Sequence, residues 1–131
     1  RDIFAPVAAE VAAGRVGPEE IGERVSELVP GWLEAPTESS HGQITGAVVT
    51  IDHFGNLITN IDGALLHSLA RAQIKVAGVE IPLRRTYSDV RPGDYLALIN
   101  SFGVLEIARA EQSAAEGLGL ARGAPVVVSH K

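Results

Sequence analysis

The chain has 131 residues, enough for one domain with a single hydrophobic core and too few for two full-sized domains. Hydrophobic residues make up 46% and charged residues 21%, the balance of a folded globular protein. A net charge of −5 excludes the broad basic surface that nucleic acid requires, and the absence of cysteine excludes disulfides, thiolate metal sites and a cysteine nucleophile.

Methionine is also absent, and the chain begins with Arg1. Two interpretations stay open: a start methionine and a short tag have been removed, or the chain is the downstream part of a longer protein. The longest apolar stretches, at residues 46–51 and 95–99, are far shorter than the roughly 20 residues that span a bilayer. The N-terminus lacks the order of a signal peptide. We expect a cytoplasmic protein with no membrane partner and no nucleic-acid partner.

Residues 1–40 are predicted to form a helical arm and a connector. Residues 5–13 are rich in alanine and end at Gly14, a typical helix stop. A second helix is predicted from Pro18, with apolar residues at helical spacing as far as Val29. The polar, proline-containing segment that follows favours an exposed connector. The two helices either pack on the next domain or form the end of a preceding one.

Residues 41–131 are predicted to form an antiparallel β-barrel-like domain, because short apolar runs alternate with Gly, Asp, Asn or Pro. The predicted strands are residues 43–51, 57–61, 74–77, 79–83, 95–100, 105–108 and 125–129. Residues 76–79 favour a tight hairpin, and residues 64–70 and 113–118 favour one or two helical turns each. The predicted fold class is therefore mainly β, preceded by two short helices.

The densest group of polar and aromatic residues lies in the sequence IDHFGNLITNI at residues 51–61. The carboxylate of Asp52 accepts hydrogen bonds from an ammonium group, and the amide of Asn56 offers a donor and an acceptor to a ring edge such as that of adenine. Phe54 offers a face for stacking. The alternative is a purely structural turn around Gly55, with Phe54 in the core.

Two further segments are candidates. Asn100 and Ser101 end an apolar strand, and Arg109 follows the next one, where it is suited to binding a carboxylate or phosphate. Tyr87 stands among small polar residues at 86–89. The structural alternatives are a solvated Arg109 and a Tyr87 that caps the core.

Metal binding and catalysis have little support in the sequence. The histidines at 41, 67 and 130 have no second ligand at metal spacing, and Arg84 and Arg85 fit a solvated strand end. A glycine-rich phosphate loop and a nucleophile elbow are absent, so no catalytic constellation is complete. The residues favour a binding surface without its catalytic groups.

Three ordered motifs, RDIFAPVAA at 1–9, IDHFGNLITNI at 51–61 and NSFGVLEIA at 100–108, followed by SAA at 113–115, resemble the S-adenosyl-L-methionine (SAM) hydroxide adenosyltransferase family. That family is related to the SAM-dependent fluorinase and chlorinase. The resemblance implies a C-terminal β-barrel domain preceded by the end of an α/β N-terminal domain. In the family the water-activating residues lie in that N-terminal domain, and their motifs are not in this chain. It also implies cleavage of SAM to adenosine and L-methionine, with SAM as substrate and no cofactor.

Site roles are implied by the same resemblance. Asp52 matches the carboxylate that holds the methionine ammonium. Phe54 and Tyr87 match the aromatic residues that flank adenine, and Asn56 matches the amide that hydrogen-bonds to the edge of adenine. Ser101 matches a residue at the methionine end, and Arg109 an arginine near the nucleotide. The implied substrate-binding residues are thus Asp52, Phe54, Asn56, Tyr87, Ser101 and Arg109. In the family the site forms between the C-terminal domain of one subunit and the N-terminal domain of its neighbour in a homotrimer. Because the family's water-activating residues lie in the N-terminal domain, no catalytic residue is expected in this chain, and no metal-binding residue is expected either.

Two departures favour the hydroxide branch. Phe102 follows Ser101 where the halogenating relatives carry an arginine, and one residue fewer separates Asp52 from Phe54. A SAM-dependent halogenase, a non-catalytic module that binds adenosine or SAM, and an assembly module remain as alternatives.

Overall fold

The computed structural model describes residues 3–27, 35–38, 42–66 and 72–130. The chain divides into two compact units, Arg1–Trp32 and Leu33–Lys131. The elements in chain order are α1 (Phe4–Ala12), α2 (Pro18–Ile21), β1 (Thr37–Glu38), β2 (Ile44–Ile51), β3 (Leu57–Asp62), α3 (Gly63–Leu66), β4 (Ala72–Val76), β5 (Val79–Ile81), η1 (Tyr87–Asp89), β6 (Tyr95–Ile99), β7 (Val104–Arg109), α4 (Ala114–Leu118) and β8 (Pro125–His130). The predicted domain boundary between residues 40 and 41 stays a prediction.

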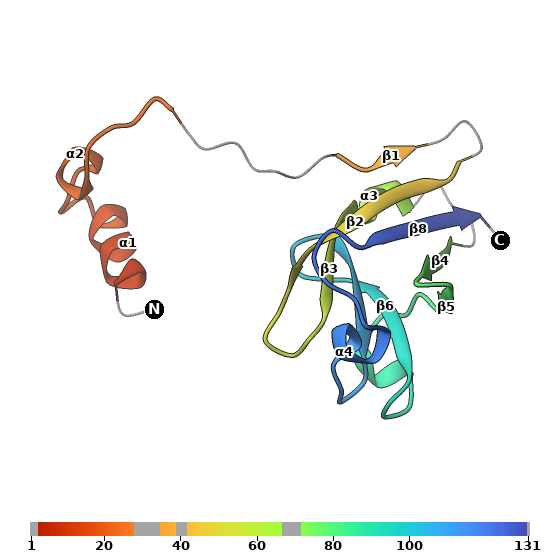
Figure 1. The fold of residues 1–131 in the computed structure, drawn as a ribbon. Coiled ribbons are helices and arrows are strands. Elements are labelled where there is room, and N and C mark those ends of the chain that lie inside the picture. Colours follow the sequence, from red (N-terminus) through yellow and green to blue (C-terminus); the bar gives the residue numbers. More distant parts are fainter. Residues whose placement is uncertain (1–2, 28–34, 39–41, 67–71, 131) are drawn as a thin grey trace. The chain divides into compact units, whose positions relative to one another are not determined.

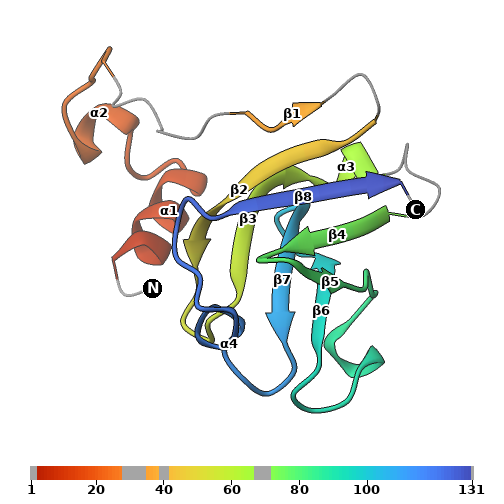
Figure 2. The ribbon, with the colours of Figure 1, turned by 45° about the vertical axis from the view of Figure 1, so that its right-hand side comes forward.

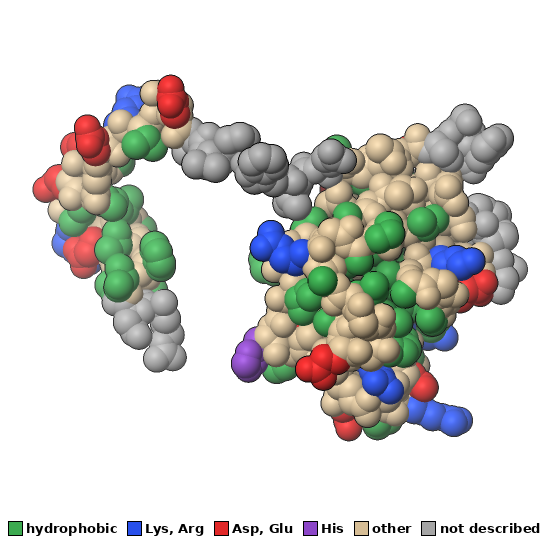
Figure 3. All heavy atoms as spheres, viewed as in Figure 1, with side chains coloured by type: hydrophobic (Ala, Val, Ile, Leu, Met, Phe, Trp, Pro, Cys, Tyr) green, Lys and Arg blue, Asp and Glu red, His purple; other side chains and the backbone are tan. Residues whose placement is uncertain are grey.

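The first unit contains the two predicted helices, but the second is shorter than predicted. α2 ends at Ile21 because Gly22, a poor helix former, is extended with φ 175° and ψ 173°. Val25, predicted to lie in this helix, follows it and is 67% exposed. α2 is a single turn and none of its side chains is buried, so no packing interaction stabilises a longer helix. Hydrophobic side chains are correspondingly exposed on this unit (Figure 3).

The second unit is a mainly antiparallel, nearly closed barrel-shaped sheet of eight strands, which confirms the predicted fold class (Figure 1). Its strand order is β5-β4-β8-β2-β3-β7-β6, and Figure 2 shows β8 between β2 and β4. β5 and β6 are the two ends of this strand order, and the chain that follows β5 hydrogen-bonds to β6. The N–H of Ala97 in β6 donates to the carbonyl of Pro82 at 2.9 Å, and the N–H of Arg84 donates to the carbonyl of Ala97 at 2.7 Å.

β1 lies in the segment predicted as a connector. Thr37 pairs with Thr45 and Glu38 with Ile44, which adds a short strand to β2. Both residues of β1 are exposed, and two residues carry no alternation of buried and exposed positions, so no sequence pattern predicts this strand.

Alternate side chains of the strands fill the barrel interior. The fully buried members include Ile44, Leu57, Ile61, Ile74, Leu105, Ile107, Val126 and Val128. Ala97 of β6 belongs to this core, so its neighbours Leu96 and Leu98 face the outside of the barrel. There they are buried with Ala108 of β7, and Val90 packs against them. The segment that carries η1 therefore covers the outer face of β6 and β7.

The predicted hairpin joins β4 and β5 through Ala77 and Gly78, with Val76 paired to Val79. Both turn residues have positive φ, 49° for Ala77 and 78° for Gly78, as a type I′ turn requires. Asparagine tolerates this conformation better than alanine. We expect Ala77→Asn to raise the free energy of unfolding by about 0.5–1 kcal/mol in urea denaturation. Ala64→Asn, on α3, is the control and should give no such gain.

Candidate functional site

The β2–β3 connection is a tight turn organised by Asp52. Its Oδ1 accepts hydrogen bonds from the backbone N–H groups of Phe54 and Asn56, both at 2.9 Å, and its Oδ2 accepts one from Nδ2 of Asn56 at 2.9 Å. The structural alternative is thus right about the turn and wrong about Phe54, whose side chain is 75% exposed. Asn56 is buried beside it. The turn presents an aromatic face and a fixed amide together.

Gly55 holds this turn against the segment that begins α4. The N–H of Ala115 donates to the carbonyl of Gly55 at 3.0 Å, and Ser113 caps α4 by accepting from the N–H of Glu116 at 3.1 Å. Gly55 has φ +83°, and a Cβ there would lie 2.6 Å from Cβ and 2.9 Å from Cα of Ser113. Only glycine permits both this conformation and this approach.

Tyr87 reaches the same region from η1. Its hydroxyl donates to Oε1 of Glu106, a carboxylate on β7 that is only 5% exposed. Burial raises the pKa of the Tyr87 hydroxyl above its usual range, and the hydrogen bond to Glu106 and the negative charges of Glu106 and Asp52 raise it further. The hydroxyl therefore keeps its proton and acts as a donor. Tyr87 is 45% exposed, so part of its side chain is open to a ligand while its hydroxyl is held by Glu106.

The β6–β7 connection repeats the organisation of the Asp52 turn. Oδ1 of Asn100 accepts from the backbone N–H groups of Phe102 at 3.0 Å and Val104 at 3.3 Å, and Gly103 has φ +78°. Phe102 is 85% exposed, as Phe54 is on the other turn. Ser101 lies at this turn and is exposed.

Arg109 is half-buried rather than solvated. Its Nε donates to the carbonyl of Gly93 at 2.9 Å, and its guanidinium lies 5.1 Å from the centre of the Tyr95 ring. These contacts fix the side chain at the end of β7 and hold a positive charge beside the turn that leads to α4.

Five of the six candidate residues line one pocket with a volume of about 570 Å³. They are Asp52, Phe54, Asn56, Tyr87 and Arg109, joined by Glu111, Gln112 and Ser113. The last three follow β7, and Glu111 has a positive φ of 60°, which is strained for a residue with a side chain. No sequence pattern marks Glu111 or Gln112, because residues of this kind are ordinary in a turn.

Ser101 lines a different pocket, of about 670 Å³, together with Phe102, Asn100 and Glu106. Asp52 lines this pocket as well as the first. The structure therefore brings all six candidates to two pockets that share the carboxylate of Asp52. The sequence does not mark Glu106, since a glutamate at an outward position of a strand is common.

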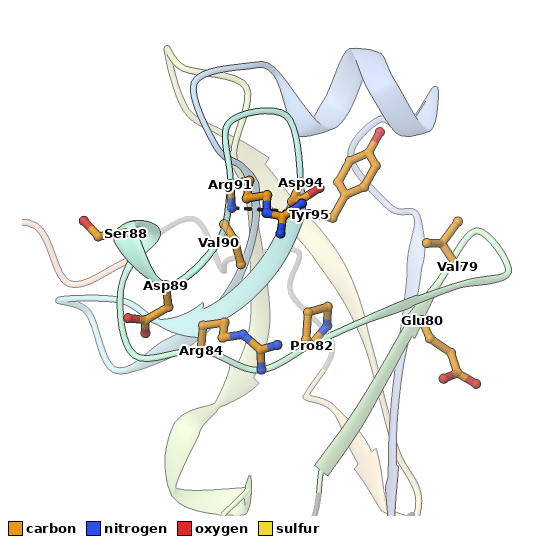
Figure 4. Close-up of a pocket in the computed structure, with 10 residues that line it drawn as sticks. All are labelled: Val79, Glu80, Pro82, Arg84, Ser88, Asp89, Val90, Arg91, Asp94 and Tyr95. Atoms are coloured by element: carbon orange, nitrogen blue, oxygen red, sulfur yellow. Dashed lines mark hydrogen bonds between the residues drawn. The ribbon is translucent and has the colours of Figure 1, made fainter.

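A third pocket, of about 590 Å³, lies between β5 and β6 and contains none of the six candidates (Figure 4). Two of its carboxylates accept hydrogen bonds from the backbone: Asp89 from the N–H groups of Arg85 and Thr86, and Asp94 from that of Arg91. In Figure 4 the side chains of Glu80 and Asp89 point away from the centre of the pocket.

The described residues contain no cluster of three or more His, Asp or Glu side chains that would hold a metal ion. His41 and His67 fall outside those residues, and the side chain of His130 is not described. The part of the chain that the structure describes also has no helix long and apolar enough to cross a membrane.

The chain is similar in sequence to proteins that are named as enzymes. Residues 46–127 match the family model of the SAM hydroxide adenosyltransferase C-terminal domain. The chain is 38% identical over 130 residues to an (R)-S-adenosyl-L-methionine hydrolase of Thermus thermophilus, covering 96% of this chain and 46% of that protein. It is 33% identical over 141 residues to a fluorinase of Actinopolyspora mzabensis, covering 98% of this chain and 47% of that protein.

Among solved structures, an uncharacterized conserved protein from Thermotoga maritima superposes with a TM-score of 0.69 at 29% identity, covering 98% of this chain and 51% of that one. The chain thus spans about half the length of the relatives that it matches. The match to the family model covers most of the β domain, including both turns and the strands that carry the site residues. The chain therefore belongs to the SAM hydroxide adenosyltransferase C-terminal domain family.

Proposed function

We propose that this chain is the SAM-binding part of an enzyme that cleaves SAM with water or hydroxide to adenosine and L-methionine. The observation that carries the proposal is the convergence of Phe54, Asn56 and Tyr87 on one pocket beside Asp52. Two aromatic side chains and a buried amide are suited to a flat heterocycle with polar edges. The relatives named as SAM hydrolases support the same ligand.

The two pockets divide the ligand between them in this proposal. The adenine ring lies in the first pocket between Phe54 and Tyr87, and the methionine end lies in the second, near Ser101. Asp52 lines both, and an ionised carboxylate has about four acceptor sites. Three of them accept from Phe54 and Asn56, which leaves capacity for the ammonium of methionine.

The reaction needs little covalent chemistry from this chain. A water or hydroxide oxygen attacks C5′ of the ribose, the C5′–S bond breaks with its electron pair going to sulfur, and methionine leaves as a neutral thioether. The enzyme then has to align the nucleophile behind C5′ and exclude bulk water. We propose that the groups that accept the water proton lie in an N-terminal α/β domain, that the full-length protein is a cytoplasmic homotrimer, and that it uses no cofactor.

Incubation of the full-length protein with SAM tests the proposal. We expect equal amounts of adenosine and L-methionine by chromatography, and in water enriched in heavy oxygen the label should enter the 5′-hydroxyl of adenosine. Asn56→Ala should lower kcat/KM by about 10- to 100-fold, because a buried amide that reads the base is lost. Arg84→Ala, in the third pocket, is the control and should leave the rate unchanged. Intact SAM after incubation with folded protein would contradict the proposal.

Halogenation is the second candidate, because a fluorinase is among the relatives. The exposed Phe102, at a position where the halogenating relatives carry an arginine, favours hydrolysis. The two reactions are distinguished by adding chloride or fluoride to the same assay. We expect no 5′-halo-adenosine, and its appearance would favour the halogenase.

A further inference from the structure

Glu106 is a buried carboxylate to which the candidate site assigns no ligand. It lies on β7 between Leu105 and Ile107, which face the barrel core, so its own side chain is on the outer face. There it is 5% exposed, close to the apolar cluster that η1 covers. A charge in such surroundings is costly unless it is hydrogen-bonded.

Among the described residues, two groups donate to Glu106, and they are neutral and come from different parts of the site. Oε1 accepts from the hydroxyl of Tyr87, which lines the first pocket, and Oε2 accepts from Nδ2 of Asn100 at 3.2 Å. Oδ1 of the same Asn100 holds the turn that carries Ser101 and Phe102 through two backbone N–H groups. One carboxylate therefore connects the aromatic wall of the first pocket to the turn of the second.

We propose that Glu106 is a positioning residue that couples the two pockets, so that occupation of one by a nucleoside favours occupation of the other by an amino acid. The proposal rests on the function proposed above. Its physical basis is that the Tyr87 ring and the Ser101 turn cannot shift independently while both are hydrogen-bonded to the same buried carboxylate. A ligand that orders one side lowers the cost of ordering the other.

The coupling is measured by calorimetry on the full-length protein, with adenosine titrated in the absence and presence of saturating L-methionine. In the wild type we expect L-methionine to lower the Kd of adenosine by at least about fivefold, and adenosine to lower that of L-methionine by the same factor. Glu106→Gln presents an amide NH₂ to one of the two donors, so this factor should fall to about one. Tyr87→Phe keeps the ring and removes the hydroxyl, and should have the same effect. Glu80→Gln removes an equal charge in the third pocket and should retain the coupling.

A spectroscopic measurement tests the contact itself. The 131-residue chain has two tyrosines, so in this chain with Tyr95→Phe the ultraviolet absorbance of tyrosinate reports Tyr87 alone. The charges of Glu106 and Asp52 raise the pKa of Tyr87; Arg109 and Glu111 line the same pocket and are unchanged in the variant. Glu106→Gln should therefore shift the titration of Tyr87 to lower pH, although burial keeps its pKa above the usual range. Circular dichroism of the same samples verifies that the variant is folded.

The outcomes separate the two proposals. Coupling that persists in Glu106→Gln, or an unchanged Tyr87 titration, would overturn the role of Glu106 and leave the proposed function intact. If adenosine and L-methionine both bind to the wild type but neither changes the Kd of the other, the role of Glu106 is likewise overturned and the proposed function stands. A wild-type protein that binds neither ligand would overturn the proposed function, and the role of Glu106 with it.

Discussion

Gly55→Ala should lower the free energy of unfolding of the β domain by about 3 kcal/mol in urea denaturation. Positive φ costs alanine about 1–2 kcal/mol, and the new Cβ would collide with the side chain and backbone of Ser113. Relief of that collision requires the Asp52 turn to move away from α4, which breaks the hydrogen bond from Ala115 to Gly55. The substitution should therefore change the shape of the pocket as well as destabilise the β domain.

Gly123→Ala is a matched control, because Gly123 has nearly the same φ, +85°, and a Cβ added there would meet no atom within 4 Å. It should incur the conformational cost alone, about 1–2 kcal/mol. Equal destabilisation by the two substitutions would show that the contact between the turn and Ser113 contributes nothing. Adenosine binding should be weakened by Gly55→Ala and unaffected by Gly123→Ala.

Asp52→Asn should weaken SAM binding by about 10- to 100-fold, with a loss of stability of only about 1 kcal/mol. Asparagine keeps an oxygen for the backbone N–H groups of Phe54 and Asn56. It removes the negative charge proposed to hold the ammonium, and it turns its NH₂ toward the side chain of Asn56. Asp52→Ala removes all three hydrogen bonds and should also destabilise the domain by about 3 kcal/mol.

Asp62→Asn serves as the control for charge. Asp62 accepts a hydrogen bond from the N–H of Ala64 at 2.8 Å and lies in neither pocket, so the same change there should leave SAM binding unaltered. Because the full-length protein is proposed to cleave SAM, both variants are measured by calorimetry with L-methionine, which carries the same ammonium and is not cleaved. If Asp52→Asn bound L-methionine as tightly as the wild type, the carboxylate would serve the turn alone.

The β domain could be predicted from the sequence because short apolar runs stand between strong turn formers, and β2 and β3 also alternate more and less buried residues. The alternation runs along β2 as far as Val49, and the β4–β5 hairpin is marked by its two turn residues, Ala77 and Gly78. The end of α2 and the presence of β1 could not be predicted, since each element is very short and has no buried face. The strand order and the near closure of the barrel depend on contacts between distant segments, which local patterns do not encode.

The site was predictable only in part, for a related reason. Asp52, Phe54 and Asn56 are neighbours in the sequence, so their association is visible there. Tyr87 joins them because η1 covers the outer face of β6 and β7, which only the fold reveals. The role of Glu106 depends on two partners 19 and 6 residues away, and its position in a strand looks unremarkable.

The proposed function depends above all on the pocket beside the Asp52 turn, which is proposed to hold the adenosine part of SAM. Nitrogen-15 NMR of the 131-residue chain, titrated with adenosine, reports on that pocket residue by residue. We expect shifts of the backbone amides of Phe54, Asn56, Tyr87 and Ser113, and their loss in Asn56→Ala. Shifts confined to the third pocket, around Arg84 and Asp94, or no shift at any attainable adenosine concentration, would show that adenosine does not bind beside Asp52.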